Sequence, residues 1–548
     1  MSFLGQFIIA VLLIFPFSSI LYAQDECCTH AHYKCQTMEL LKNRKDKELH
    51  SDRLQEDFRI PMQSKFPSQE GYFVIHFDTV GVNKVDLTDS NQNGVPDYID
   101  SVAFYFDAAY VFLVNQLGYN PPPPDSSFGG DDRYDIHIVN LVAEDYAIYG
   151  YTEVELDINP PLKHPRYTSS IYIDNDFSPF DSIKVANGNK IPAYAITGIN
   201  AVKITSVHEL HHAIQFGYGF PDDDGVAFME MSSTWLESEL YPDLNNYLAY
   251  IGDLFRSLES YPLSESNNAQ TGYRWNVFFK YLSEAYSPKL ILDFWSFILE
   301  EQTSFEALYS SIEANNLDYN DVWTEFLSWI YHTNTRANGD TYFAEAARFP
   351  RLTINLSENM SSDIFEIVEL LQPYQFMPIR INNLSGSDKG ITHFDFIIGK
   401  IQPKTVTDEL SEFTLKINKN EDSQIPYSMF KYNLEADKGG IVSAVFVNDG
   451  ARYPEESFVL PNPIDLTVDD FFIAVPLLNA NNLKYNIMIY DPSYMVVVDK
   501  NIEPSRSSGY TGFRIDLDDN SLASGVYLYS ISGNEKSFFG KFAITKKK

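Results

Sequence analysis

Three histidines and a glutamate lie within five consecutive residues, in the stretch HELHH from His208 to His212. The stretch matches H-E-x-x-H, a pattern in which two histidines on one helix face bind a metal ion and the glutamate acts as a base. The chemistry that such a group supports is hydrolysis by a water molecule that the metal activates and the glutamate deprotonates.

Helix geometry indicates which histidines would bind the ion. Residues four positions apart differ by about 40° around an α-helix, so His208 and His212 can point at one ion. Glu209 lies about 100° from His208, beside the metal. His211 lies about 160° from Glu209, so a pair that included it would leave the base facing away. We therefore predict His208 and His212 as ligands, Glu209 as the catalytic base, and His211 as a supporting or exposed residue.

A helix cap is the alternative interpretation of Glu209. Ser206 and Glu209 have the S/T-x-x-E spacing of a capping box, in which both side chains bind free N–H groups at the start of a helix. This alternative leaves the two in-phase histidines, His208 and His212, without an explanation.

A third protein ligand is expected, because a catalytic zinc usually has three and keeps one position for water. A second helix is predicted after the sequence DDDG. If the two helices form a hairpin, His212 and Glu230 lie nine residues before and after its midpoint, at the same height. Glu237 lies about two turns farther along the helix, so we predict Glu230 as the ligand. Thr234 and Glu237 share its face and are predicted to support a ligand, and a solvated helix face is the alternative.

The stretch DSNQNGVPDYID, residues 89–100, matches a 12-residue calcium loop. Gly94 falls where the loop turns sharply, and Asp in place of Glu at the last position is a departure. The predicted calcium ligands are Asp89, Asn91, Asn93, Val95 (through its carbonyl), Asp97 and Asp100. The role would be structural, and the alternative is an Asx-rich turn before a helix. The acidic segments GGDDRYD and DNDF are weaker cation candidates.

Composition and length limit the possible classes of protein. The chain has 548 residues, of which 44% are hydrophobic, and a net charge of −35. This length predicts several folded domains. The negative charge argues against nucleic acid or an anionic membrane as a partner, because phosphates would repel it.

The sequence pattern changes along the chain. Residues 61–350 have strand-like runs around 71–80, 133–141 and 169–177 and helical patterns at 99–119 and beyond 200, which predicts an α+β domain. Residues 351–457 and 458–548 consist of short strand-like runs, which predicts all-β sandwich domains.

The N-terminal residues carry signals for export. Residues 1–23 contain an apolar run that ends at Ala23 and are predicted to be a signal peptide, with a membrane anchor as the alternative. Residues 24–60 are charged and are predicted to be a pro-segment or a cap. No other segment approaches the ~20 apolar residues of a membrane span, so none is expected in the mature protein.

All three cysteines lie in CCTHAHYKC, residues 27–35. One alternative is a local disulfide to Cys35 with one thiol left over. A second is a metal-binding tail that includes His30 and His32. A third is a latent enzyme in which a cysteine of this segment blocks the metal.

Four motifs of residues 61–350 resemble a family of bacterial secreted metalloproteases. They are TDSNQNGVPDY, GGDDRYD, HELHHAIQFGY and EMSSTWLE, in the order of the family. The resemblance implies a zincin-like fold of the gluzincin type. It also implies His208, His212 and Glu230 as zinc ligands and Glu209 as the base.

The C-terminal residues 458–548 are similar to the type A sorting domain of the type IX secretion system. The matching residues are LPNP at 460–463, YNIMIYD, LASGVYLYSISG and GKFAITKKK. The resemblance implies the secretion machinery as a partner and a secreted or surface location in a Gram-negative bacterium.

The function expected from these observations is that of a secreted zinc metallopeptidase that cleaves a protein or peptide substrate. One alternative is a non-catalytic adhesin or scaffold with the same shape. Another is a zinc hydrolase with a different class of substrate.

Overall fold

The structure is a computed structural model that describes Cys35, Thr37 and most residues from Arg59 to Thr545. Its internal gaps are residues 125–129, 143–147, 159–161, 185–187, 222–224, 338–340, 360–363, 383–392, 404–405, 407–409, 420–429, 437–439, 449–456, 461–463, 466–469, 476–483, 494, 508–509, 517–523 and 534–536. The predicted signal peptide, residues 1–23, and most of the predicted pro-segment lie outside the described residues.

A mixed five-stranded sheet occupies the N-terminal side of the first domain. Its strands are β1 (Ser64–Pro67), β2 (Phe73–Phe77), β3 (Tyr134–Val139), β4 (Gly150–Asp157) and β5 (Tyr167–Asp174). Their order is β1-β2-β3-β5-β4, which makes β4 an edge strand. β2, β3 and β5 are parallel, whereas β4 is antiparallel to β5. β6 (Ser182–Lys184) and β7 (Lys190–Pro192) form a separate hairpin.

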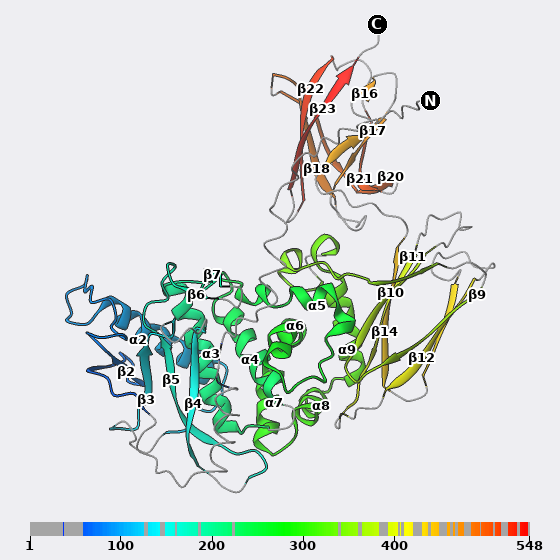
Figure 1. Ribbon diagram of the computed structural model, residues 1–548. Helices are drawn as coiled ribbons and strands as arrows, with labels where there is room; N and C mark the ends of the chain where they lie inside the picture. The colour runs from blue at the N-terminus through cyan, green and yellow to red at the C-terminus, as the bar shows by residue number, and fades with distance from the viewer. Residues whose placement is uncertain are drawn as a thin grey trace, which may run out of the picture.

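Helices cover one face of this sheet and continue away from it (Figure 1). They are α2 (Asp97–Tyr110), α3 (Ile199–Tyr218), α4 (Gly225–Leu240), α5 (Gly252–Arg256), α6 (Ala269–Ala285), α7 (Lys289–Leu299), α8 (Ser304–Ala314) and α9 (Tyr319–Tyr331). Buried isoleucines of the sheet, such as Ile75, Ile136 and Ile171, pack with the helices in one core. The structure thus confirms a mixed α and β first part.

The start of α3 contradicts the capping-box interpretation of Glu209. The helix begins at Ile199 after Gly198, which has a φ of 57° and no side chain to serve as a cap. Ser206 lies well inside the helix, and its hydroxyl donates to the carbonyl of Lys203 at 2.8 Å. The apolar run INAVKI extends the helix ahead of the motif, so Glu209 is not at a helix start.

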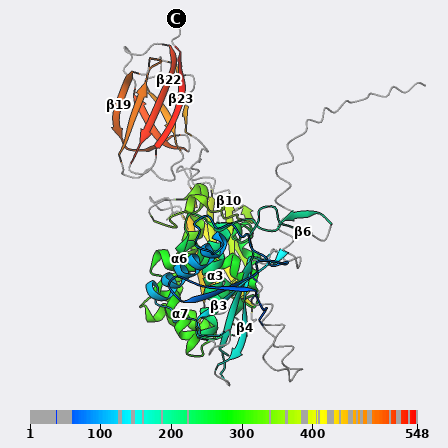
Figure 2. The ribbon, with the colours of Figure 1, turned by 90° about the vertical axis from the view of Figure 1, so that its left-hand side faces the viewer.

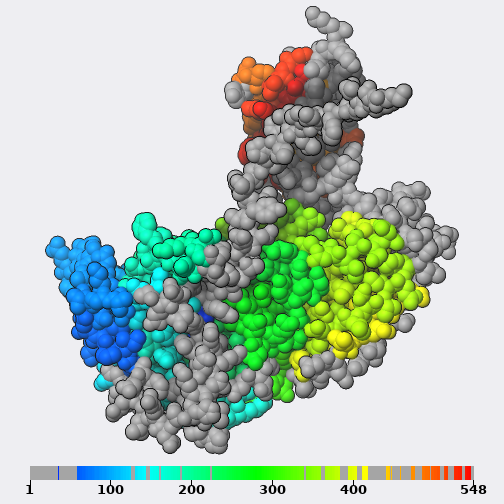
Figure 3. Space-filling view, in the orientation of Figure 1, coloured from blue at the N-terminus to red at the C-terminus, as the bar shows by residue number. Residues whose placement is uncertain are grey.

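A first β-sandwich follows the helices. Its strands are β8 (Leu356–Asn359), β9 (Ile364–Leu371), β10 (Phe376–Asn382), β11 (His393–Lys400), β12 (Ser411–Lys419), β13 (Phe430–Ala436) and β14 (Ile441–Asn448), in the orders β14-β11-β10-β8 and β13-β12-β9. It packs against the helical part: the rings of Tyr331 and Phe446 stack at 3.6 Å, and the Tyr331 hydroxyl donates to Asp395 at 2.8 Å. Figure 3 shows the two parts in contact.

A second sandwich lies apart from the rest in both ribbon views (Figures 1 and 2). Its strands are β15 (Phe458–Leu460), β16 (Ile464–Asp465), β17 (Asp470–Ala474), β18 (Tyr485–Tyr490), β19 (Val496–Ile502), β20 (Ser505–Ser507), β21 (Tyr510–Asp516), β22 (Gly525–Ser532) and β23 (Ser537–Thr545). They form two sheets around a core of their own. All-β domains therefore follow the α+β part, as predicted. Among the described helices, none combines the length and apolar character that crossing a membrane requires.

Candidate metal centre

Helices α3 and α4 bring the three predicted zinc ligands together. His208 and His212 lie on one face of α3, and their Nε2 atoms are 3.1 Å apart. Glu230, from α4, places Oε2 at 3.3 Å from His208 Nε2 and 3.7 Å from His212 Nε2. All three side chains are buried. The hairpin geometry assumed from the sequence therefore matches the position of Glu230.

Hydrogen bonds on the far side of each imidazole determine its proton position. His208 Nδ1 lies 2.7 Å from Glu237 Oε1, and His212 Nδ1 lies 2.7 Å from Gln215 Oε1. The Gln215 amide is oriented by its Nε2, which donates to the carbonyl of Met229 at 3.0 Å. Both Nδ1 atoms therefore carry a proton and donate it. Each Nε2 is left with a lone pair that points into the centre, as a metal ligand requires.

Glu230 adds a buried negative group to these two lone pairs. Within the described part of the chain, neither of its carboxylate oxygens has a well-aligned hydrogen-bond donor. A buried carboxylate without a donor is costly, and a bound cation compensates it. The donor set of two imidazoles and one carboxylate fits a zinc ion.

Glu209 lies beside this group and belongs to a different set of contacts. Its Oε2 accepts a hydrogen bond from the Thr152 hydroxyl of β4 at 2.9 Å. Close approach of β4 to α3 depends on Gly150, where a Cβ would lie 2.8 Å from the Tyr172 carbonyl and 3.2 Å from Glu209 Cγ. The carboxylate is thus held by a strand next to the three candidate ligands.

His211 is buried, so the prediction that it could be an exposed residue is wrong. Its ring makes edge-to-face contacts with Tyr119 and Trp295, at centroid distances of 5.2 Å and 5.9 Å. Its Nδ1 lies 3.0 Å from the Ser233 hydroxyl of α4. His211 therefore holds the two helices together on the side away from the candidate centre.

Of the two predicted supporting residues, Glu237 contacts a ligand and Thr234 does not. Glu237 binds His208 as above, and its Oε2 accepts from Asn246 at 3.0 Å, so it fixes the imidazole. The Thr234 hydroxyl is buried without a hydrogen-bond partner among the described residues. Gln215, which orients His212, was not predicted, although its i+3 position on the same helix was a usable signal.

Helix α6 contributes two further residues, Tyr273 and Gly272, to the surroundings of the centre. The ring of Tyr273 stacks near His208 at a centroid distance of 6.4 Å. Burial, and then the charge of Glu230, raise the pKa of the Tyr273 hydroxyl well above its usual value, so it stays protonated and can donate. Gly272 lets α6 approach α4: a Cβ there would lie 2.3 Å from the Ala227 carbonyl and 2.6 Å from Glu230 Cβ.

Gly272→Ala should weaken metal binding, because the added methyl group must displace either α6 or Glu230. Overpacking of this kind costs about 1–3 kcal/mol, so the melting temperature should also fall. Zinc affinity can be measured by competition with a chromophoric chelator. Gly252→Ala is the matched control, since a Cβ there meets nothing within 4 Å. Wild-type zinc affinity in Gly272→Ala would show that this contact does not position the ligand.

Cys35 also reaches the centre. Its Sγ and one ligand atom each of His208, His212 and Glu230 all lie within 4.8 Å of one another, and the four residues are buried. Burial, and then the carboxylates of Glu209 and Glu230, raise the pKa of the thiol well above its usual value. Cys35 is a free cysteine in the structure, which argues against the alternative of a local disulfide to it. His30 and His32, the other residues of the predicted tail, lie outside the described residues.

The predicted calcium loop draws its polar side chains together. Asp89 accepts hydrogen bonds from the backbone N–H groups of Asn93 (3.1 Å) and Gly94 (2.9 Å). The amides of Asn91 and Asn93 each donate to Asp100 Oδ2 at 2.9 Å. Asp97 accepts from the backbone of Ser90 at 2.9 Å and begins α2. Both the calcium loop and the Asx-rich turn fit these contacts.

Calcium should raise the melting temperature if the loop binds it, and EGTA should reverse the effect. The physical reason is that an ion that binds only the folded state stabilises it by mass action. Asp89→Ala should remove the calcium dependence, whereas Asp86→Ala, outside the loop, should keep it. The measurement is thermal unfolding of zinc-loaded protein with and without calcium. Equal melting temperatures in the wild type would identify a turn without an ion.

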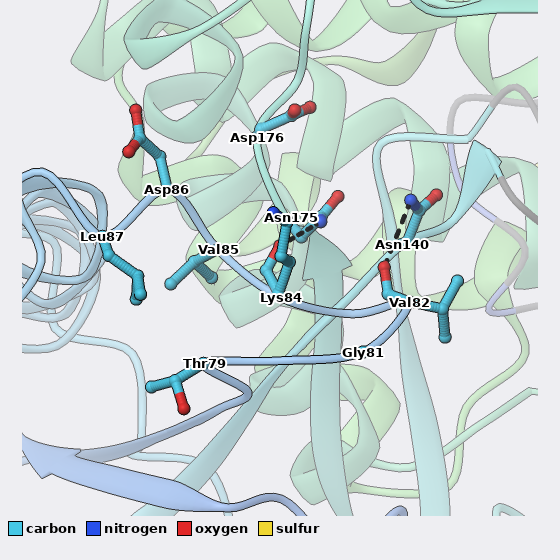
Figure 4. Close-up of a pocket in the computed structure, with 10 residues that line it drawn as sticks. All are labelled: Thr79, Gly81, Val82, Lys84, Val85, Asp86, Leu87, Asn140, Asn175 and Asp176. Atoms are coloured by element: carbon cyan, nitrogen blue, oxygen red, sulfur yellow. Dashed lines mark hydrogen bonds between the residues drawn. The ribbon is translucent and has the colours of Figure 1, made fainter.

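A surface pocket of about 590 Å³ lies where β3 and β5 end (Figure 4). Asn175 donates to the Lys84 carbonyl at 2.7 Å, and Asn140 to the Val82 carbonyl at 3.4 Å, which ties the 79–87 loop to the strand ends. The nearby carboxylates of Asp174, Asp176 and Asp181 lie within 4.8 Å of one another. Asp174 already accepts backbone N–H groups of Leu141, Asp176 and Phe177. These contacts are those of a polar turn, so the segment DNDF, residues 174–177, does not need a cation to be satisfied.

Comparison of the chain with protein-family models and with curated proteins finds no match. The assignment of a function therefore depends on the geometry of the site and on the sequence motifs.

Proposed function

We propose that this chain is a secreted zinc metallopeptidase in which His208, His212 and Glu230 bind the ion and Glu209 is the general base. One observation carries the proposal. Two imidazole lone pairs and a carboxylate without a donor converge in a buried site, with a second carboxylate beside them. A structural zinc site has four protein ligands and no such base, whereas a hydrolytic site needs one.

Each residue has a separate task in this proposal. A bound zinc ion would polarise the substrate carbonyl and lower the pKa of a water molecule. Glu209 takes the proton of that water and passes it to the leaving amine. Glu237 and Gln215 keep the imidazoles of His208 and His212 in the tautomer that binds metal. The buried Tyr273 hydroxyl is a candidate donor to the developing oxyanion.

The position of β4 favours a peptide as the substrate. β4 is an edge strand, and Thr152 on it contacts the proposed base directly. An extended peptide can add to such an edge through backbone hydrogen bonds, which presents its carbonyl groups in a regular row. The motif helix α3 packs against this edge strand, which supports the proposal of a zincin-like fold. A zinc hydrolase for small substrates would have no need of this edge.

Export remains a proposal that the C-terminal motifs support. Residues 458–548 would act as the type IX sorting domain, and the secretion machinery would be the partner. The second sandwich has its own core, which suits a module that can be recognised separately.

The test of the peptidase proposal is zinc content and cleavage of casein, an unstructured protein. The expected result is one zinc per chain and cleavage once the N-terminal segment is removed through a protease site inserted within residues 38–58. A chelator should abolish the cleavage, and added zinc should restore it. Stoichiometric zinc without cleavage of casein or of a peptide library would favour the non-catalytic scaffold.

A further inference from the structure

Cys35 comes from a segment far from the motif helices in sequence, yet its sulfur lies among the proposed zinc ligands. Sγ, two imidazole nitrogens and a carboxylate oxygen lie within 4.8 Å of one another. A cysteine thiolate is a preferred zinc ligand, and four protein ligands make a closed, tetrahedral site. A hydrolytic site must instead keep one position free for water. The four residues together therefore describe a centre that binds zinc and excludes water.

The residues around Cys35 also occupy the edge of β4. Cys35 pairs with Gly150 in a parallel bridge. The backbone N–H of Thr152, two residues along the strand, donates to the Thr37 hydroxyl at 2.7 Å. This is the edge to which a peptide substrate is proposed to add. A substrate cannot bind there while Cys35 and Thr37 are in place.

The same two residues contact the proposed base. The Thr37 hydroxyl donates to Glu209 Oε2 at 3.4 Å, and Cys35 Sγ lies 3.5 Å from the same oxygen. Thr152 is bonded to this oxygen as well. Three groups thus surround the oxygen that would take the proton from water. One short stretch of chain, with Cys35 and Thr37, therefore covers the proposed metal position, the β4 edge and the proposed base.

We propose that Cys35 is a fourth zinc ligand that keeps the enzyme latent, and that removal of its segment opens the site. This inference depends on the proposed zinc site and peptidase function. On binding, the Cys35 thiol loses its proton to solvent and its sulfur takes the fourth position. On release, the thiolate takes a proton from solvent and a water molecule replaces it. No oxidant or reductant is required.

The chain offers a place where the segment can be separated. Arg59 is held to the sheet by Glu155, with hydrogen bonds of 2.6 Å and 2.8 Å, and by Asp135. The residues after it therefore keep their anchor when the chain is cut earlier. Residues 38–58 contain several basic residues that trypsin-like proteases can recognise: Lys42, Arg44, Lys45, Lys47 and Arg53. Hydrolysis of one peptide bond there disconnects Cys35 from the domain.

Cobalt substitution tests the sulfur ligand without measuring activity. Full-length protein loaded with Co²⁺ should show a thiolate-to-cobalt charge-transfer band in the near ultraviolet. Cys35→Ser should lose this band and still bind one Co²⁺ per chain. The control is Cys27→Ser/Cys28→Ser, which should keep the band. A wild-type protein that binds one Co²⁺ without the band, or a band that persists in Cys35→Ser, would overturn the proposal.

Zinc release and latency give two further readouts. Full-length Cys35→Ser should lose zinc to a chelator at least ~10-fold faster than the wild type, because it has one ligand fewer. It should also cleave casein faster than full-length wild type, because the segment without its sulfur ligand should leave the β4 edge more readily. If the charge-transfer band is present and zinc release is slow, but no form of the protein cleaves casein, Cys35 remains a zinc ligand and the peptidase proposal is refuted. Equal zinc release and equal casein cleavage in the two full-length proteins would refute latency through Cys35.

Discussion

Glu209→Gln should bind zinc as the wild type does and lose cleavage of casein by about 10²–10⁴-fold, the usual contribution of a general base. The glutamine has the same shape and can still accept the Thr152 hydrogen bond, observed at 2.9 Å. It cannot take a proton from water. Glu209 is not one of the proposed metal ligands, so the ion should remain. The measurement is kcat/KM together with metal content, on protein from which the N-terminal segment has been removed.

Substitutions at Thr152 provide the controls for this prediction. Thr152→Ser keeps a hydroxyl for Glu209, whereas Thr152→Val has a similar volume and removes the hydrogen bond. The valine variant should lower kcat with little change in KM, because the base is no longer held by the same donor. Full activity in Glu209→Gln would place the base elsewhere, and loss of zinc would make Glu209 a ligand.

The helix-borne part of the site was accessible from the sequence because its geometry is local. His208, Glu209 and His212 share one helix, and the 3.6-residue period fixes their relative directions. Glu230 was accessible through one further assumption, a hairpin of two helices. The pairing of Glu237 with His208 follows from the same hairpin. In each case a regular element converts spacing in sequence into position in space.

The other parts of the site belong to elements that are distant in sequence from α3 and α4. Their packing against these helices cannot be predicted from the spacing of residues within one helix. Strand β4 was not predicted from its sequence GYTEVELD, in which Glu153, Glu155 and Asp157 are charged. One of these, Glu155, is buried because Arg59 binds it, which obscures the apolar pattern. Gly272 matters only because α6 packs against α4. Cys35 was considered as a blocking residue, but sequence spacing could not choose between that role, a disulfide and a metal-binding tail.

In protein from which the N-terminal segment with Cys35 has been removed, Glu230→Ala should abolish stoichiometric zinc binding, whereas Glu237→Ala should keep one zinc per chain with about 10–100-fold lower affinity. The first change removes a ligand, and the second removes the partner that orients a ligand. Glu230 Oε2 lies 3.3 Å from His208 Nε2, on the side of the lone pair. Glu237 Oε1 lies 2.7 Å from His208 Nδ1, on the opposite side of the ring. Metal titration with a competing chelator measures both affinities.

Without metal, substitutions at the two glutamates should have opposite effects on stability: a change at Glu237 should be the more damaging one. Glu237→Ala leaves His208 Nδ1 and the Asn246 amide without their acceptor, which costs about 1–3 kcal/mol for each buried group. Glu230→Gln keeps the volume and removes a buried charge that has no well-aligned donor, so in excess chelator it should be at least as stable as the wild type. Added zinc should reverse the order, because only the wild type and Glu237→Ala gain from it. If Glu237→Ala loses the ion and Glu230→Ala keeps it, the ligand is Glu237, and the roles derived from the helix hairpin are exchanged.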